Sequence, residues 1–253
     1  MTVAILSDIH MRDGYVEEIT QELRAVLAEL ERHNPEHAFV LGDLIEDGDS
    51  VAIDRENVRR VHTLLSEWSV PVTYLLGNHD VEHLEKNKLG HILDQQQFYG
   101  VVESGETTFV YLDTAYEELG GAMGRIGGEQ LQWLETQLES LSDVILLTHH
   151  PVGDFDLAEN EWFADYPERA YLWERKEVLE ILSHCDGVHG TISGHIHQTE
   201  HTEFWGVSHV SINAFSKELP DKPLTGTYGL LSTDRTHEIS IQTRADDGVS
   251  YLL

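Results

Sequence analysis

Short apolar runs alternate with longer segments of helical period in the first part of the chain, and this order restricts the fold more than any other feature. The apolar runs are Val3–Leu6, Ala38–Leu41 and Val72–Leu76. Between them, Tyr15–His33 and Ile53–Trp68 repeat their apolar residues at the interval of an amphipathic helix. A strand-helix-strand-helix-strand order favours parallel strands joined by right-handed crossovers. The sequence therefore predicts an α/β fold.

The rest of the chain adds strands and helices without a linker that would divide it. We expect two strands around a glycine-containing turn in Phe98–Ala115, and helices over Gly128–Leu141 and Glu174–Cys185. Further strands are expected at Val144–Leu147, Val188–Ser193, Trp205–Phe215, Thr227–Asp234 and His237–Arg244. The 253 residues can bury a sizeable core. We predict a single domain over residues 1–253, with two mixed β-sheets packed face to face and flanked by helices.

The charge of the chain is strongly negative. Asp and Glu number 46 against 16 Lys and Arg, which gives a net charge of −30. Such a surface repels nucleic acids and anionic membranes, so neither is an expected partner. Self-repulsion also destabilises a compact fold unless salt screens it, and at molar salt the screening length falls to about 3 Å. We hypothesise a halophilic protein of a salt-rich cytoplasm; an acidic mesophilic protein is the alternative.

The cysteine content and the N-terminal sequence favour a reduced compartment. Cys185 is the only cysteine, so no intramolecular disulfide can form. The opening residues, MTVAILSD, lack the basic region and the long apolar run of a signal peptide. No segment reaches the roughly 20 apolar residues of a membrane span. We therefore expect a cytoplasmic protein.

Five predicted strands are followed by side chains that can bind metal ions. These side chains are Asp8 and His10 in SDIH, Asp43 in GDL, Asn78, His79 and Asp80 in GNHD, His149 and His150 in THHP, and His195 and His197 in GHIH. The carboxyl ends of parallel strands share one edge of a sheet, so these groups are expected to converge. One such motif alone usually marks only a turn. Five of them at five separate strand ends favour a common site.

The donor types in these motifs predict a pair of metal ions. Carboxylate, amide and imidazole groups suit Mn, Fe or Zn, and no thiolate is near. Asp8 and His10 are two residues apart, so in an extended segment their side chains project to the same side. His195 and His197 repeat this spacing, and Asp43 is placed to bridge two ions. Glycines allow the backbone to turn closely around a crowded site before three of the motif residues: Gly42, Gly77 and Gly194.

The motifs DIH, GD, GNHD, HH and GHIH, in this order, resemble those of the calcineurin-like metallophosphoesterases. The resemblance implies a four-layer fold of two packed mixed sheets flanked by helices. It also implies roles for individual residues. One metal would be held by Asp8, His10 and His197, the other by Asn78, His149 and His195, with Asp43 between them. His79 would face the substrate phosphate or the leaving oxygen, and Asp80 would orient His79.

A second set of motifs resembles the branch that contains the class III cyclic nucleotide phosphodiesterases. These motifs are YLDTA, GRIGGEQLQWLETQLE and ILLTHHPVG. The implied activity is hydrolysis of a small phosphodiester, with cyclic nucleotides among the candidates. A metal-bridging hydroxide would attack phosphorus, and His79 would assist the leaving group. The acidic and aromatic segment Asp154–Tyr171 matches no pattern of the branch, and we expect it to shape specificity.

Two alternatives to a phosphodiesterase remain open. One acts on another class of phosphate ester, and the other has no substrate. The first is a phosphomonoesterase or nucleotide pyrophosphatase of the same superfamily, which would share the metal ligands. The second is a non-catalytic interaction scaffold of the same fold. Such scaffolds can lack the histidine of the GNH motif, so the presence of His79 favours an enzyme. A nuclease is disfavoured because the chain lacks a basic groove. His150 is a further candidate to line the site.

Overall fold

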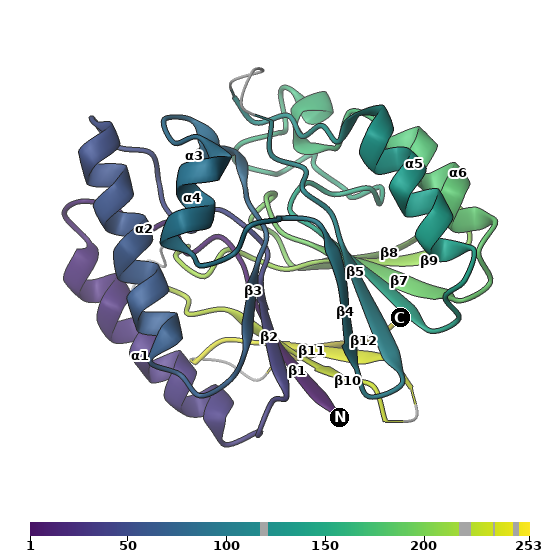
Figure 1. The fold of residues 1–253 in the computed structure, drawn as a ribbon, viewed down its shortest axis with the longest axis horizontal. Coiled ribbons are helices and arrows are strands. Elements are labelled where there is room, and N and C mark those ends of the chain that lie inside the picture. The colour runs from purple at the N-terminus through teal and green to yellow at the C-terminus, as the bar shows by residue number, and fades with distance from the viewer. Residues whose placement is uncertain (117–120, 218–223, 235, 245–247) are drawn as a thin grey trace.

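The computed structural model describes residues 1–116, 121–217, 224–234, 236–244 and 248–253 (Figure 1). Within these residues the chain forms two mixed sheets of six strands each. The strand orders are β12-β11-β10-β1-β2-β3 and β4-β5-β6-β7-β9-β8. Helices α1 to α4 lie on one side of the molecule and helices α5 and α6 on the other, with both sheets between them.

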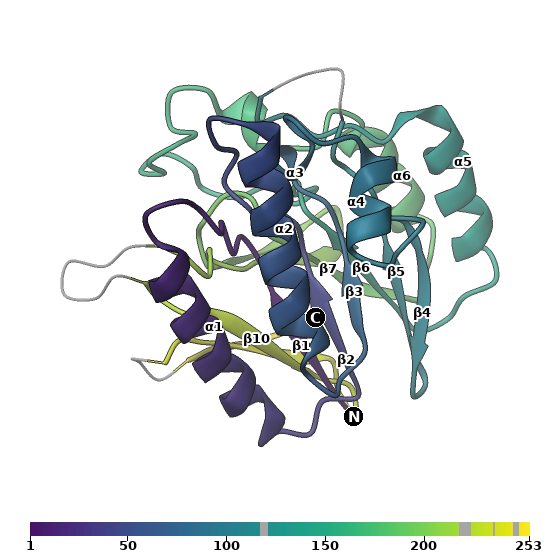
Figure 2. The same cartoon turned by 60° about the vertical axis from the view of Figure 1, so that its left-hand side comes forward.

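The first sheet joins the two ends of the chain. Its parallel part consists of β1 (Thr2–Leu6), β2 (His37–Val40) and β3 (Val72–Tyr74). Its antiparallel part consists of β10 (Tyr228–Ser232), β11 (Glu238–Gln242) and β12 (Val249–Leu252). The crossovers are α1 (Val16–Glu31) and α2 (Val51–Ser66), and Figure 2 shows both helices along one face of this sheet. The short helices α3 (Asn78–Val81) and α4 (Lys86–Ile92) follow β3.

The second sheet is parallel at its centre and antiparallel at both edges. The central strands are β5 (Thr107–Tyr111), β6 (Val144–Thr148), β7 (Val188–Ser193) and β9 (Val207–Ser211). The edge strands are β4 (Gly100–Ser104) and β8 (Glu200–Phe204). Its outer face is covered by α5 (Gly127–Leu138) and α6 (Arg175–Ser183).

The alternation of side chains along each strand divides the core into layers. In β1, Val3 and Ile5 point into the cluster between the two sheets, whereas Ala4 and Leu6 pack with the helices. Phe39 of the first sheet meets Phe109 of the second with ring centroids 5.1 Å apart. Both rings are fully buried. The predicted four-layer α/β fold is therefore confirmed.

Some elements differ from the sequence prediction. Helices α3 and α4 and strands β8 and β12 were not expected from the sequence. Helix α4 has only seven residues and contains Gly90, so it is too short to show a clear helical repeat. The five motif-bearing strands also lie in two sheets, because β1–β3 belong to the first and β6 and β7 to the second. None of the helices in the described ranges is both long and apolar enough to cross a membrane.

Candidate active site

The carboxyl ends of the parallel strands in both sheets meet at one place. Loops after β1, β2 and β3 bring Asp8, His10, Asp43 and Asn78 there, and loops after β6 and β7 bring His149, His195 and His197. The structure thus brings together all seven residues that the sequence predicts as metal ligands. Except for Asn78 and His197, which are partly exposed, these residues are buried.

One group of four donors consists of Asp8, His10, Asp43 and His197. His10 Nε2 lies 3.0 Å from His197 Nε2 and 3.8 Å from Asp43 Oδ2. Asp8 Oδ1 lies 3.3 Å from His197 Nε2 and 3.9 Å from His10 Nε2. One donor atom from each residue lies within 4.8 Å of the others, so a single ion can contact all four.

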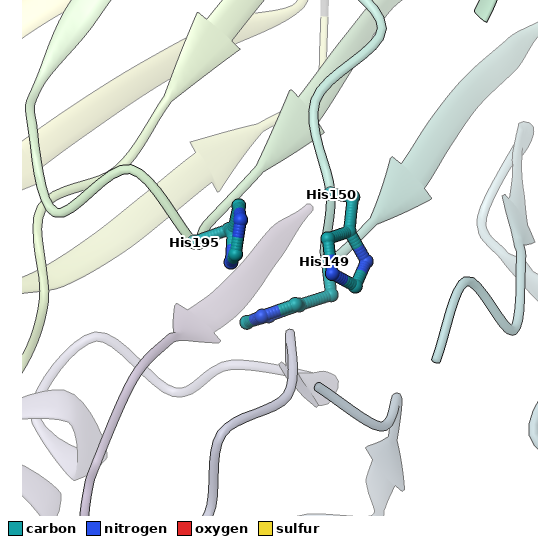
Figure 3. Close-up of side chains that lie close together, drawn as sticks. All are labelled: His149, His150 and His195. Carbon is teal, nitrogen blue, oxygen red and sulfur yellow. The ribbon is translucent and has the colours of Figure 1, made fainter. Parts of the chain in front are cut away.

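A second group of donors surrounds His149. Its Nε2 lies 3.3 Å from Asp43 Oδ2 and 3.4 Å from Asn78 Oδ1. Figure 3 shows the imidazoles of His149, His150 and His195 gathered in one place, the first two following β6 and the third following β7. Asp43 therefore lies between the two groups, beside His10 on one side and His149 on the other.

His150 lies beside the second group of donors, although it is not among the predicted ligands. Its side chain is fully buried, and its Nδ1 shares a 2.8 Å hydrogen bond with Thr114 Oγ1. Its Nε2 is buried without a hydrogen-bond partner in the described chain, and the same holds for His195 Nδ1. The ring centroids of His150 and His195 are 4.4 Å apart. The motif THHP was the sequence signal for His150, but the motif does not show which of its two imidazoles points into the site.

The backbone at the ligands is mostly left-handed. Eight non-glycine residues of the described ranges have φ in this region, and five of them are predicted ligands. These are Asp8 (53°), His10 (46°), Asp43 (48°), His195 (70°) and His197 (48°). The prediction that Asp8 and His10 lie on an extended segment is therefore wrong. Their side chains converge through a strained loop instead, and such strain is concentrated at functional sites.

Glycine is required next to these ligands because of close backbone approach. Gly42 has a φ of 103°, and a Cβ there would lie 2.6 Å from Gly77 N and 2.7 Å from His149 Nδ1. A Cβ at Gly77 would collide with the Asp43 side chain. The loops after β2 and β3 can therefore pack this closely only because neither position carries a side chain.

The electrostatics of the two groups fit bound divalent cations. Burial opposes the charge of Asp8, but the neighbouring His197 outweighs it and lowers the pKa of Asp8 to about 2. Burial likewise opposes the charge of Asp43, yet His149 and His79 hold its pKa well below the usual range. Two buried carboxylates thus stay ionised. Burial also lowers the pKa of His10 to about 3, which keeps that imidazole neutral. At His149 burial is outweighed by Asp43, which raises the pKa of that imidazole to about 9, so a cation bound beside Asp43 would displace this proton.

His79 lies at the mouth of the site and has a carboxylate partner. Its Nδ1 lies 2.5 Å from Asp47 Oδ1, and its backbone N–H donates to Asp43 Oδ1 at 3.0 Å. Burial disfavours the imidazolium, but Asp43 and the hydrogen bond to Asp47 outweigh it and raise the pKa of His79 to about 9. The His79 side chain is 30% exposed, so it can meet a substrate from solvent.

The predicted contact between Asp80 and His79 is corrected by the structure. The fully buried Asp80 carboxylate accepts hydrogen bonds from the backbone N–H groups of Leu44, Ile45 and Gly77. Asp80 thus ties the loop after β2 to the loop after β3, and Asp47 takes the place beside His79. Asp47 lies four residues after Asp43 in a loop with several acidic residues, so no sequence pattern singled it out.

A small pocket opens over the two groups of donors. It has a volume of about 240 Å³ and is lined by His10, Asp43, Glu46, Asn78, His79, Ala122, Trp162, Phe163, Tyr166, Arg169, His195 and His197. The segment Asp154–Tyr171, expected to shape specificity, supplies Trp162, Phe163, Tyr166 and Arg169 to its wall. A larger groove of about 910 Å³ lies between α5 and α6, but none of the donors described above lines it.

Comparison with known proteins matches the chain to one family model and to several relatives. Residues 1–199 match the model of the family described as calcineurin-like phosphoesterase. The chain is 26% identical over 208 residues to a probable cyclic nucleotide phosphodiesterase of Synechococcus sp., which covers 78% of this chain and 74% of that protein. It is also 26% identical over 207 residues to a probable cyclic nucleotide phosphodiesterase of Moraxella catarrhalis, covering 76% and 70%.

Solved structures share the fold. A dimetal phosphatase from Danio rerio superposes with a TM-score of 0.78 at 16% identity, over 100% of this chain and 98% of that one. A phosphopantetheinyl hydrolase from Mycobacterium tuberculosis superposes with a TM-score of 0.55 at 13% identity, over 84% and 89%. The family match covers well over half of the chain and includes every motif of the site. The chain therefore belongs to the calcineurin-like phosphoesterase family and is a hydrolase that acts on phosphoesters.

Proposed function

We propose that the protein is a phosphodiesterase that uses two metal ions, Mn, Fe or Zn, to hydrolyse a small diester. The arrangement that carries this proposal is the pair of donor groups that share Asp43, with His79 at the open side. Asp8, His10 and His197 would hold one ion, and Asn78, His149 and His195 the other. When bound, such ions lower the pKa of water and neutralise phosphate charge.

The residues around the ions have separate tasks in this proposal. His79 is positioned by Asp47 through Nδ1, which leaves Nε2 to donate a proton to the departing alkoxide. Asp80 contributes indirectly, because it fixes the two loops that carry Asp43 and Asn78. His150 packs behind His195 and restricts the orientation of that imidazole.

The pocket wall supports a substrate with both an anionic and an aromatic part. Trp162 is 63% exposed, so its ring is available for stacking, and Tyr166 is 54% exposed. Arg169 lines the same pocket, with its guanidinium 4.8 Å from the centroid of the Tyr166 ring. A cation beside aromatic faces suits a phosphate attached to a nucleobase. We therefore propose cyclic nucleotides, as in the names of the relatives, as the first substrates to test.

A nucleotide pyrophosphate is the second candidate substrate. An adjoining pocket of about 550 Å³ shares His10, Trp162 and His197 with the first one, and Arg12 and Lys217 lie in its lining. Arg12 and Lys217 would attract a second phosphate, whereas Glu46 and Glu161 in the same lining would oppose it. The interaction scaffold is the third reading, and it predicts no turnover with any ester.

A substrate panel tests the proposal. The protein is assayed in molar KCl with Mn²⁺ against p-nitrophenyl phosphate, its bis-ester, 2′,3′- and 3′,5′-cyclic nucleotides and nucleotide diphosphates. We expect the highest kcat/KM for a cyclic nucleotide. Asp43→Asn should lose bound metal and turnover, whereas Asp94→Asn should keep both. Asp94 is a matched control, because it also has a left-handed backbone but is exposed and belongs to neither donor group. A preference for diphosphates would favour the second candidate, and no turnover would favour the scaffold.

A further inference from the structure

A third cluster of metal-binding side chains lies at the opposite ends of β6 and β7. Asp143 precedes β6, His189 is the second residue of β7, and His237 precedes β11. One donor atom from each lies within 4.8 Å of the other two. Because β6 and β7 place His149 and His195 at their carboxyl ends, this cluster is separated from the active site by the length of the strands, roughly 15 Å or more.

The two imidazoles face the same carboxylate oxygen. The rings of His189 and His237 are stacked, with centroids 3.9 Å apart and planes inclined by 21°. Asp143 Oδ1 lies 2.9 Å from His237 Nε2 and 3.5 Å from His189 Nε2. Neither approach has the alignment of a hydrogen bond, so within the described residues this buried oxygen has no hydrogen-bond partner. Two nitrogens directed at one unsatisfied oxygen enclose a position suited to a cation.

The donor atoms of the cluster can be reached from solvent. Thr107 Oγ1 lies 3.2 Å from His237 Nε2 and can release that nitrogen by rotating its hydroxyl. The side chains of Asp143 and His189 are 32% and 35% exposed, so an ion can enter from solvent and both groups can rotate towards it.

We propose that Asp143, His189 and His237 form an additional site for a zinc-class divalent cation, distinct from the active site. Two imidazole nitrogens and one carboxylate oxygen are a common donor set for Zn²⁺ and Co²⁺, with water completing the coordination. His189 and Asp143 belong to the second sheet and its loops, whereas His237 leads into a strand of the first. An ion there would link the two sheets at the ends of the strands opposite the active site, and its role would be structural.

Metal counting with matched variants tests this site. The chelator-treated protein is titrated with Co²⁺ and with Zn²⁺ in molar KCl and excess Mg²⁺, because Mg²⁺ competes for surface carboxylates but poorly for imidazoles. His189→Asn should bind one equivalent less than the unsubstituted protein and lose part of the Zn²⁺-induced rise in Tm. His91→Asn, at an exposed position on α4, should change neither. Phosphoester turnover should be equal in all three.

A second variant protects the test against misfolding. Asp143→Asn is isosteric and should remove the same equivalent, and it should shift the visible spectrum of the Co²⁺ form. The comparison does not depend on the proposed function, because it measures the difference of one equivalent whatever the active site holds. Asp43→Asn provides the separation: it should retain this equivalent while losing those of the active site. Equal metal content in the unsubstituted protein, His189→Asn and Asp143→Asn would overturn the proposal.

Discussion

His79 Nδ1 lies 2.5 Å from Asp47 Oδ1 at the mouth of the site, and this pair links the GNH motif to a loop that no motif marks. Among the described residues, only Nδ1 of this imidazole makes a side-chain hydrogen bond, and the residue lines the pocket. The Asp47 side chain is 31% exposed, so this carboxylate stands at the rim of the site and not in its interior. The pair resembles other histidine–carboxylate arrangements in which the carboxylate fixes both the tautomer and the orientation of the ring.

Replacing Asp47 should separate positioning from metal binding. Asp47→Asn removes the charge that favours the imidazolium, so kcat should fall about 10- to 100-fold while metal content is unchanged. Because Asp47 helps to raise the pKa of His79, the alkaline limb of the kcat–pH profile should move to lower pH. Asp49→Asn, two residues further along and exposed, is the control and should leave kcat and the profile as they are. An unchanged profile in Asp47→Asn would assign Asp47 a merely structural role.

The close approach of the loops after β2 and β3 leads to a second prediction. Gly77→Ala places a methyl group against the Asp43 side chain, so the variant should lose at least about 2 kcal/mol of stability and most of its bound metal. Gly128→Ala in the first turn of α5 meets no atom within 4 Å and should be neutral or stabilising by up to about 1 kcal/mol. Urea unfolding and metal analysis of both variants provide the measurement. Retention of metal by Gly77→Ala would show that the loop can move aside.

Much of the fold and the composition of the site could be predicted because both follow from local pattern. Strand and helix periods are set by which faces are buried, and Val3 and Ile5 against Ala4 and Leu6 show this within a single strand. The donors follow strands because loops at the carboxyl ends of parallel strands meet. Gly42 and Gly77 were expected for close approach, and the backbone confirms that no side chain fits there.

The remaining features depend on how separate loops pack, which the local pattern does not contain. Asp80 follows His79 in sequence, yet its carboxylate turns towards Leu44 and Ile45 because those buried N–H groups need acceptors. Asp47 reaches His79 only through the fold. The left-handed backbone at Asp8 and His10 was hidden because their two-residue spacing is equally compatible with an extended segment.

A buried histidine outside the site should make the stability depend on pH. His209 is fully buried, with Nδ1 2.7 Å from Thr191 Oγ1 and Nε2 3.1 Å from Phe204 O. The neutral ring therefore donates through Nε2 and accepts through Nδ1. Burial lowers its pKa from the model-peptide value of 6.5 to about 4. Between these two values the unfolded chain binds more protons than the folded one, so stability must fall as the pH falls.

The expected size of this effect is on the order of 3 kcal/mol between pH 6.5 and pH 4, because each unit of pKa shift corresponds to about 1.4 kcal/mol. Urea unfolding over this range should show a shallower pH dependence for His209→Gln than for the unsubstituted protein. His33→Gln, at an exposed position, should retain the full dependence. Parallel curves for all three proteins would mean that the His209 ring is protonated without loss of its contacts.

The excess of acidic residues leads to a final prediction, on salt. Glu139 caps the carboxyl end of α5, where a negative charge opposes the helix dipole, and Glu135 lies one turn before it. Both line the groove between α5 and α6, which also holds Glu177 and Glu180.

Glu139→Gln should therefore raise the free energy of unfolding by about 0.5 kcal/mol at 0.1 M KCl, because like charges are poorly screened there. At 3 M KCl the gain should largely disappear. Glu129→Gln, in the first turn of the same helix, is the matched control and should give no gain, since a negative charge there is favourable.

Urea unfolding at the two salt concentrations provides the measurement. The unsubstituted protein should itself be more stable at 3 M KCl if it is adapted to a salt-rich cytoplasm. Equal stability of the unsubstituted protein at both concentrations would contradict the halophilic hypothesis, whereas an equal gain from Glu139→Gln at both would show that its effect is not electrostatic.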